Sequence, residues 1–310
     1  MARRRHIRHT QRKHPSKIIK PDFILLDQFS VADIRKREAL VSQFLKYHWD
    51  YYKELAYQRS RIADKIKEAL LGAAQKRFTF EKWQRAVKYK YATNPLSMRG
   101  SLVDPAGGRF NIGDINPSQF PSFPALYIAA DKGTALQELL CQKIDPGEEA
   151  RAAEFALTDP RSTANVSLSG HLDCIINLNS PGDLLPFVEL IKNFIIPDYL
   201  KKTAQKIGES EPALVRTVPQ LVDALLDPNW RRWPMQLDVP TPAQIFGQLV
   251  AQAGLEGILY PSKFTGRDCL AIFPQNFDKS DSFVQLDDEA PKECTIRRLD
   301  AKTWSSQDVT

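Results

Sequence analysis

The sequence predicts an α+β protein in which a helical N-terminal region precedes a sheet-containing domain. Short apolar runs typical of strands mix with helix-forming segments, without the regular strand–helix alternation of a doubly wound sheet. A hydrophobic fraction of 43% and a charged fraction of 26% over 310 residues are ordinary for a soluble globular protein. No stretch approaches the ~18 consecutive apolar residues that suggest a membrane helix, so we expect a cytoplasmic protein without membrane contact.

The N-terminal region of the chain is basic and the rest is acidic. Residues 1–90 carry 23 Lys and Arg against 9 Asp and Glu, and the remaining residues carry 20 against 28. Residues 1–20 hold much of the positive charge and few apolar residues, which predicts a flexible tail. This tail could contact nucleic acid by neutralising phosphates, or it could be a solvated chain end.

Residues 21–90 are expected to form a helical region. Ser30 opens a segment that resembles a capping box, and helix formers run from there to a C-cap expected at Gly72. A second helix is expected over residues 79–90. An aromatic stripe in this region favours packing against the next domain or a partner, with nucleic-acid binding as the alternative; its members are Tyr47, Trp49, Tyr51, Tyr52 and Tyr57.

The segment 91–125 is rich in Gly, Pro, Asn and Asp and offers little room for regular structure. Long irregular segments within a compact protein are usually functional or disordered. Strands and helices are expected after it. The strand candidates are 125–130, 153–158, 174–178, 257–261 and 269–273, and the helix candidates are 131–143, 185–195, 212–227 (interrupted by Pro219) and 241–254.

Common catalytic and metal-binding motifs are absent from the sequence. The four cysteines have no CxxC spacing, and the five histidines show no ligand spacing near them, so no metal site and no disulfide framework is expected. There is no P-loop, no GxGxxG motif and no Gly-x-Ser-x-Gly elbow. Classical hydrolase chemistry is therefore weakly supported.

The residues that remain as candidates for chemistry are Arg99, Arg109, Tyr127, Glu138 and Ser262. Arginine forks suit phosphates, and a tyrosine ring can flank a flat heterocycle. A glutamate can stabilise the oxocarbenium-like state formed when a glycosidic bond breaks. NAD has a pyrophosphate, a nicotinamide ring and a ribose with a cationic leaving group, so it fits this set as a substrate.

Two blocks of the sequence resemble the RES domain family, which is named for an arginine, a glutamate and a serine. The first block is Arg99-Gly100, then GGRFN at 107–111, LYIA at 126–129 and ALQE at 135–138. The second is QIFG at 244–247, then GLEGILYPS at 254–262 and CLAIFP at 269–274. The resemblance covers roughly residues 95–280, and Ser262 stands where the family serine is expected.

The resemblance implies a fold and an activity. RES-domain proteins are best known as toxins of toxin–antitoxin pairs, their antitoxins typically carry an Xre-like domain, and their fold resembles ADP-ribosyltransferases. Members hydrolyse or phosphorolyse NAD or transfer ADP-ribose to protein. By this resemblance Arg99 and Arg109 would hold the phosphates, Tyr127 would pack beside the nicotinamide, Glu138 would support the breaking bond, and Ser262 would position the nicotinamide or its ribose.

These observations predict four segments: a basic tail at 1–20, a helical region at 21–90, a RES domain with an ADP-ribosyltransferase-like mixed sheet at 91–285, and a C-terminal tail at 286–310. The expected activity is cleavage of the nicotinamide–ribose bond of NAD, and the expected partner is an Xre-type antitoxin. A second copy of the chain is an alternative partner for residues 30–90. The alternative function is nucleic-acid binding or partner docking through the basic helical N-terminal region, with an inert later domain.

Overall fold

A computed structural model describes residues 31–140, 163–210, 212–290 and 292–306. The chain divides into two compact units, residues 1–43 and residues 44–310. In the first unit the described residues form the beginning of helix α1 (Val31–Ser60), which continues into the second unit. The basic tail at 1–20, the cap expected at Ser30 and the strand expected at 153–158 lie outside the described residues. No helix in the described ranges has the length and apolar character needed to cross a membrane.

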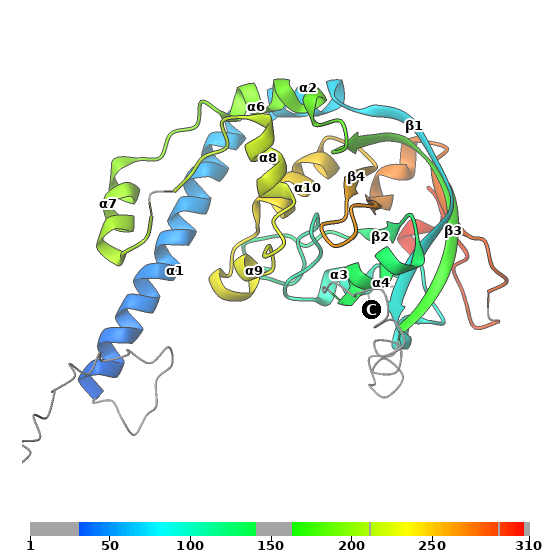
Figure 1. Cartoon of the computed structure of the whole chain (residues 1–310), viewed down its shortest axis with the longest axis horizontal. Helices are drawn as coiled ribbons and strands as arrows, with labels where there is room; N and C mark the ends of the chain where they lie inside the picture. Colours follow the sequence, from blue (N-terminus) through cyan, green and yellow to red (C-terminus); the bar gives the residue numbers. More distant parts are fainter. Residues whose placement is uncertain (1–30, 141–162, 211, 291, 307–310) are drawn as a thin grey trace, which may run out of the picture. The chain divides into compact units, whose positions relative to one another are not determined.

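The second unit is built on a seven-stranded sheet in the order β1-β2-β5-β4-β3-β6-β7, with a further pairing between β1 and β3. The β3–β4 pair is parallel and all others are antiparallel, so the expected mixed sheet is confirmed. The long strands β1 and β3 curve side by side in Figure 1. The strands are β1 (Gln75–Lys88), β2 (Leu126–Ala129), β3 (Thr163–Asn177), β4 (Gly257–Pro261), β5 (Asp268–Ile272), β6 (Phe283–Leu286) and β7 (Arg298–Leu299).

The helix predicted at 79–90 is wrong, because these residues belong largely to β1. The β1–β3 register shifts between Phe80 and Trp83, and Lys82 has a φ of 55° in this bulge. The bulge inserts an extra residue, so Phe80, Trp83 and Val87 project inward at intervals of three and four instead of two. That spacing imitates the helical period, which explains the error.

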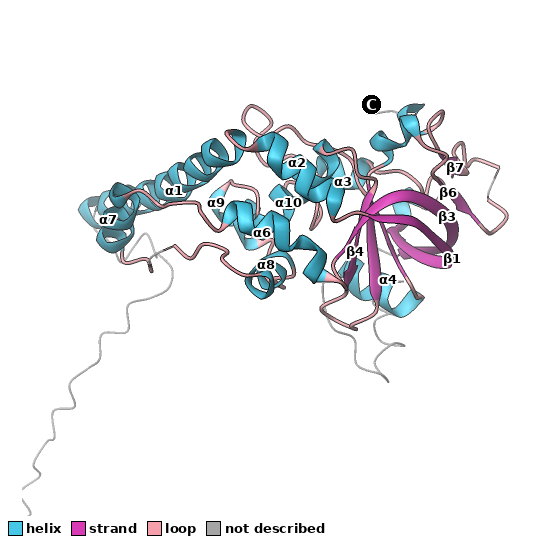
Figure 2. Cartoon of the chain, turned by 90° about the horizontal axis from the view of Figure 1, so that it is seen from above, coloured by secondary structure: helices cyan, strands magenta, loops and turns pink. Residues whose placement is uncertain are grey.

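Helices pack beside the sheet, and α6, α8 and α10 gather on one side of it in Figure 2. The helix expected at 212–227 begins only at Val218 and ends at Leu225, so residues 212–217 are not helical. Pro219 does not interrupt it. It lies in the first turn of α8, where proline is tolerated, and Thr217 caps that helix by accepting from the Gln220 amide. The helices after α1 are α2 (Ala63–Gly72), α3 (Arg99–Val103), α4 (Lys132–Leu140), α6 (Leu185–Ile191), α7 (Asp198–Ile207), α8 (Val218–Leu225), α9 (Arg232–Leu237) and α10 (Pro242–Gln252).

Alternate side chains of the central strands pack into two separate apolar cores, one on each face of the sheet. On β4, Ile258 and Tyr260 join the core that contains the helices, whereas Leu259 joins the core on the opposite face of the sheet. The segment 286–310, expected as a tail, contributes β7 to the sheet, and Leu299 is fully buried in the second core. The chain is therefore part of the folded unit at least as far as β7, and residues 286–299 are not a tail.

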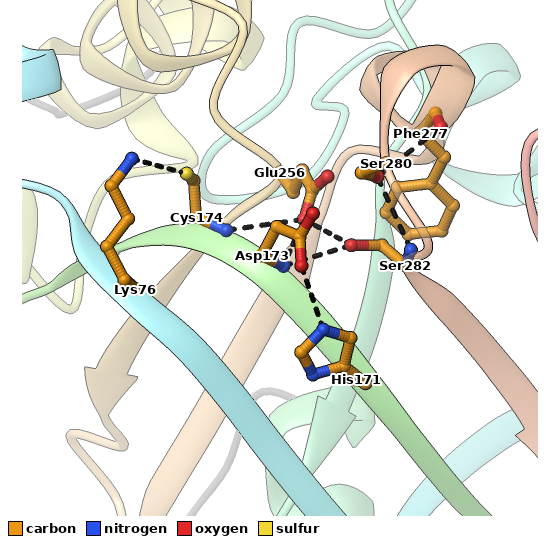
Figure 3. Close-up of polar contacts among 8 residues, drawn as sticks. All are labelled: Lys76, His171, Asp173, Cys174, Glu256, Phe277, Ser280 and Ser282. Atoms are coloured by element: carbon orange, nitrogen blue, oxygen red, sulfur yellow. Dashed lines mark hydrogen bonds and ion pairs between the residues drawn. The ribbon is translucent and has the colours of Figure 1, made fainter.

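A buried carboxylate ties three segments of this sheet together, as Figure 3 shows. Glu256 is 3% exposed, and its Oε2 accepts from the Asp173 amide at 2.7 Å and from the Ser282 hydroxyl at 2.7 Å. These bonds link β3 to the residue before β4 and to the loop before β6. Beside them, His171 pairs with Asp173 at 2.8 Å at the protein surface.

Candidate active site

A cavity of about 410 Å³ lies between β1, β2, α4 and the loop that contains the Gly-Gly-Arg turn. Small-molecule sites typically have volumes of about 300–1,000 Å³, so the cavity is large enough for part of a nucleotide. The wall includes the β1 residues Arg85 and Lys88, the loop residues Gly108 and Arg109, and Tyr127, Glu138, Trp230, Arg231, Tyr260 and Cys269.

The backbone of the turn at 107–111 requires its two glycines. Gly107 has a φ of 63°, in the left-handed region that side chains disfavour. A Cβ on Gly108 would lie only 2.3 Å from the Tyr127 hydroxyl. The glycines therefore let the turn close against the strand that carries Tyr127.

Buried amides hold this turn in place. The Gln244 side chain is fully buried and donates to the carbonyls of Ala106, Gly108 and Asn111 at 2.7, 3.1 and 3.0 Å. Asn111 accepts from the Tyr127 hydroxyl at 2.8 Å, and that hydroxyl accepts from the Phe110 amide at 2.9 Å. Burial raises the pKa of the Tyr127 phenol, so it stays protonated and can make both bonds.

Close packing of α10 on the turn gives a testable prediction about stability. A Cβ on Gly247 would lie 1.9 Å from the Phe110 carbonyl oxygen, whereas one on Gly72, also helical, would meet no atom within 4 Å. We expect Gly247→Ala to lower the free energy of unfolding by about 1–3 kcal/mol because α10 must move away. Gly72→Ala should leave stability unchanged or raise it. Urea denaturation of both variants checks this, and equal stabilities would contradict the packing described.

Glu138 and Ser262 meet directly, although 124 residues separate them. The Ser262 hydroxyl donates to Glu138 Oε1 at 2.6 Å and accepts from the amides of Phe264 and Thr265 at 3.2 and 3.4 Å. These two amides orient the hydroxyl proton toward the glutamate. Glu138 lines the cavity, whereas Ser262 is 3% exposed and lies outside the lining residues. Ser262 therefore positions the carboxylate from behind.

A second contact fixes α4, the helix that carries Glu138, to the loop after Ser262. Asp131 accepts from the Thr134 amide and hydroxyl at 2.9 and 2.8 Å, and the Thr134 hydroxyl also contacts the Thr265 hydroxyl at 2.9 Å. Burial raises the pKa of Asp131, but the Thr134 bonds and Arg267, 3.5 Å away, outweigh it and lower the pKa overall. The ionised aspartate caps α4 and holds its direction.

Arg109 is 5% exposed and its guanidinium is partly engaged by the protein itself. Nη1 donates to the Asp227 carbonyl at 2.9 Å and to the Leu225 carbonyl at 3.5 Å. Its Cζ lies 5.9 Å from the centre of the Trp230 ring, which the Arg231 guanidinium also contacts, at 4.4 Å. Arg109 thus joins the turn to the segment after α8 at the cavity wall.

Two further arginines differ sharply in their environments. Arg85, on β1, donates from Nε, Nη1 and Nη2 to the carbonyls of Pro95, Tyr127 and Ser97 at 2.8, 2.9 and 2.9 Å. Burial lowers its pKa to about 10, so it remains charged at neutral pH. Arg99, at the start of α3, is exposed and is not among the residues that line the cavity.

The cavity wall combines positive charge with two carboxylates, Glu138 and Asp104, and Asp104 accepts from the Ala106 amide at 2.8 Å. Lys88 and Arg231 are exposed at the wall, while Arg85 and Arg109 are inside it. In the described ranges, no three His, Cys, Asp or Glu side chains form a group that could hold a metal ion. The arrangement can bind an anionic molecule and place its reacting carbon near Glu138.

The sequence of the segment that forms this site matches one known family. The RES domain family profile matches residues 82–292, which span the cavity and both halves of the Glu138–Ser262 pair. The chain belongs to the RES domain family. The matched region begins within β1 and continues beyond β6, so it includes the end of β1, which the expected boundaries of 91–285 left outside.

One solved structure resembles this RES-domain chain weakly. It is the crystal structure of the M. tuberculosis MbcT–MbcA toxin–antitoxin complex, of which one chain is 14% identical with a TM-score of 0.35. The alignment covers 79% of this chain and 98% of that one. No curated protein matches the sequence.

The RES-domain residues predicted from sequence lie in three places. Arg109, Tyr127 and Glu138 line one cavity, Ser262 stands behind Glu138, and Arg99 lies outside the lining. Arg85 was missed, because one arginine in a strand gives no local signal and its carbonyl partners come from other segments. Lys88 and Arg231 were also missed. The motifs at 107–111 and 244–247 contain Asn111 and Gln244, but no local pattern indicated that Gln244 binds the turn or that Asn111 accepts from Tyr127.

Proposed function

We propose that this RES-domain protein binds NAD in the cavity of about 410 Å³ and cleaves its nicotinamide–ribose bond. The observation that carries the proposal is the Glu138 carboxylate on the cavity wall, held by Ser262 at 2.6 Å. A fixed negative charge stabilises positive charge that develops on a ribose, because the enzyme pays no reorganisation cost at the moment of reaction.

The chemistry requires one bond to break and one to form. As the glycosidic C–N bond breaks, its electron pair goes to nicotinamide, which leaves neutral, and positive charge spreads over the ribose C1 and ring oxygen. Glu138 would face this charge. Water, phosphate or a protein side chain would then add to C1, and its proton would be lost. Lys88, Arg109 and Arg231 supply positive charge for the pyrophosphate, and Tyr127 supplies an aromatic wall.

The proposed biological role is that of a toxin in a toxin–antitoxin pair, with an Xre-type antitoxin as its partner. The protein would act in the cytoplasm, and its own fold would be ADP-ribosyltransferase-like. These features rest on membership in the RES domain family and on the expectations stated for it. Removal of NAD would harm a cell that lacked the partner, so we expect expression of the active chain alone to be difficult. Contact of residues 1–20 with nucleic acid remains a separate prediction.

Product analysis tests the reaction and names the acceptor. Purified protein is incubated with NAD in ¹⁸O-labelled water, with and without phosphate, and products are followed by mass spectrometry. We expect nicotinamide together with either ¹⁸O-labelled ADP-ribose or, where phosphate is the acceptor, ADP-ribose 1″-phosphate. Transfer to protein would appear as an added ADP-ribose mass on a polypeptide. Intact NAD in the presence of folded protein, with no modified polypeptide after incubation with cell extract, would contradict the proposal.

A further inference from the structure

A second cavity, of about 340 Å³, lies among α1, α8, α10 and the segment that follows α8. Its walls are almost entirely aliphatic and aromatic and include Phe187, Leu221, Trp233 and Phe246. It shares Trp230 with the cavity that contains Glu138, but the Glu138 carboxylate does not line it. It is therefore a separate space that the proposed reaction does not use.

One cationic side chain, Arg59 near the end of α1, lines this apolar cavity. Its Cζ lies 5.8 Å from the centre of the Tyr52 ring, its side chain is hydrogen-bonded to the Tyr52 side chain, and Tyr51 is a second neighbour. Burial lowers the pKa of the guanidinium, although both phenols partly offset this effect. Within the described part of the chain, no carboxylate lies within ion-pair distance of Arg59.

The neighbours of Arg59 do not neutralise its charge. Burial raises the pKa of Tyr51 to about 12 and also raises that of Tyr52, so both phenols are neutral at physiological pH. Asp227 also lines the cavity, where its Oδ1 accepts from the Asn229 amide at 2.8 Å. Arg59 is half-buried, so its guanidinium is partly desolvated without an anionic partner, and an incoming anion would offset that cost.

We propose that this second cavity binds a small amphipathic monocarboxylate, with the carboxylate at Arg59 and the apolar body among the buried aromatic and aliphatic side chains. A guanidinium presents two parallel N–H groups that match the two oxygens of one carboxylate. A cavity of ~150 Å³ holds benzene, so about 340 Å³ accommodates an apolar body of roughly ten carbons. The ligand class is that of medium-chain fatty acids and aromatic acids of similar size.

Decanoate is the probe for this site, and the full-length chain is used without NAD so that the result is independent of the proposed reaction. Binding is measured by calorimetry and by tryptophan fluorescence, because Trp230 and Trp233 line the cavity. Decyltrimethylammonium, which has the opposite charge, is titrated in parallel, and both are kept below their micelle concentrations. We expect saturable binding of one decanoate with a change in fluorescence, and no saturable binding of the cation.

Two variants connect binding to the cavity. Arg59→Met keeps an unbranched apolar stem but removes the charged guanidinium, and we expect affinity for decanoate to fall roughly ten- to a hundredfold through loss of a charge-assisted contact. Arg61→Met, at an exposed position two residues later, should bind as the wild type does. Ile245→Trp fills the cavity while leaving Arg59 in place, and it should abolish binding.

Circular dichroism confirms that each variant is folded. The proposal is overturned if the folded wild type binds no decanoate saturably, or if Arg59→Met and Arg61→Met bind it equally. It is also overturned if decanoate binds the filled Ile245→Trp variant as tightly as the wild type. Should Arg59→Met fail to fold, the comparison of the wild type with Ile245→Trp still shows whether decanoate binds in this cavity.

Discussion

Replacement of Glu138 by Gln is expected to lower the rate of NAD cleavage at least about a hundredfold, with the fold unchanged. Gln has the same size and its amide oxygen can still accept the 2.6 Å hydrogen bond from Ser262. Only the negative charge that would face the developing positive charge on the ribose is lost. Because that charge acts mainly in the transition state, kcat should fall much more than KM rises.

Matched variants separate this catalytic effect from a structural one. Glu68→Gln changes an exposed glutamate on α2 and should leave the rate unchanged. Ser262→Ala removes a hydroxyl that orients Glu138 and should lower kcat about tenfold, because the carboxylate keeps its charge but loses this hydrogen bond. A Glu138→Gln protein that cleaves NAD at the wild-type rate would show that the carboxylate has another role.

Replacement of Arg85 by Met is expected to lower the free energy of unfolding by at least about 3 kcal/mol. The guanidinium donates to the carbonyls of Pro95, Ser97 and Tyr127, and a methionine would leave these acceptors buried without it. Each buried acceptor left unsatisfied costs about 1–3 kcal/mol. The loss should also disturb the cavity, since Arg85 joins β1 and β2 at its wall.

Urea denaturation measures this loss. Arg297→Met is the control, because Arg297 is exposed and precedes β7 far along the chain. We expect it to change stability by less than about 0.5 kcal/mol, as is usual for surface substitutions. If Arg85→Met were as stable as Arg297→Met, the three carbonyls would have to find other hydrogen-bond donors. Arg85 would then not stabilise the fold by joining β1 to the segments that carry these carbonyls.

Local signals were enough to predict much of the second unit. The strands at 257–261 and 269–273 are confirmed because short apolar runs bounded by turn residues rarely suit a helix. The GGRFN motif at 107–111 was singled out from the sequence, and the structure shows that both of its glycines have little room for a side chain. The helix expected at 241–254 is confirmed, and its cap at Thr241 follows the capping-box pattern.

Features that depend on distant contacts could not be predicted in this way. The bulge in β1 is set by pairing with β3, so nothing near Lys82 in the sequence distinguishes the strand from a helix. Gln244 contacts carbonyls more than 130 residues earlier in the chain. The RES-family resemblance named Glu138 and Ser262, but only the structure shows that one orients the other. The role of Arg99 stays a prediction.

The most direct test of the account is the time course of nicotinamide release when the purified wild-type chain is incubated with NAD. Release at a constant rate that is proportional to protein concentration, and that disappears in the folded Glu138→Gln variant, is the result we predict. Absence of release from folded wild-type protein, with and without cell extract as a source of acceptors, would contradict the assignment of the Glu138 cavity as an NAD-cleaving site.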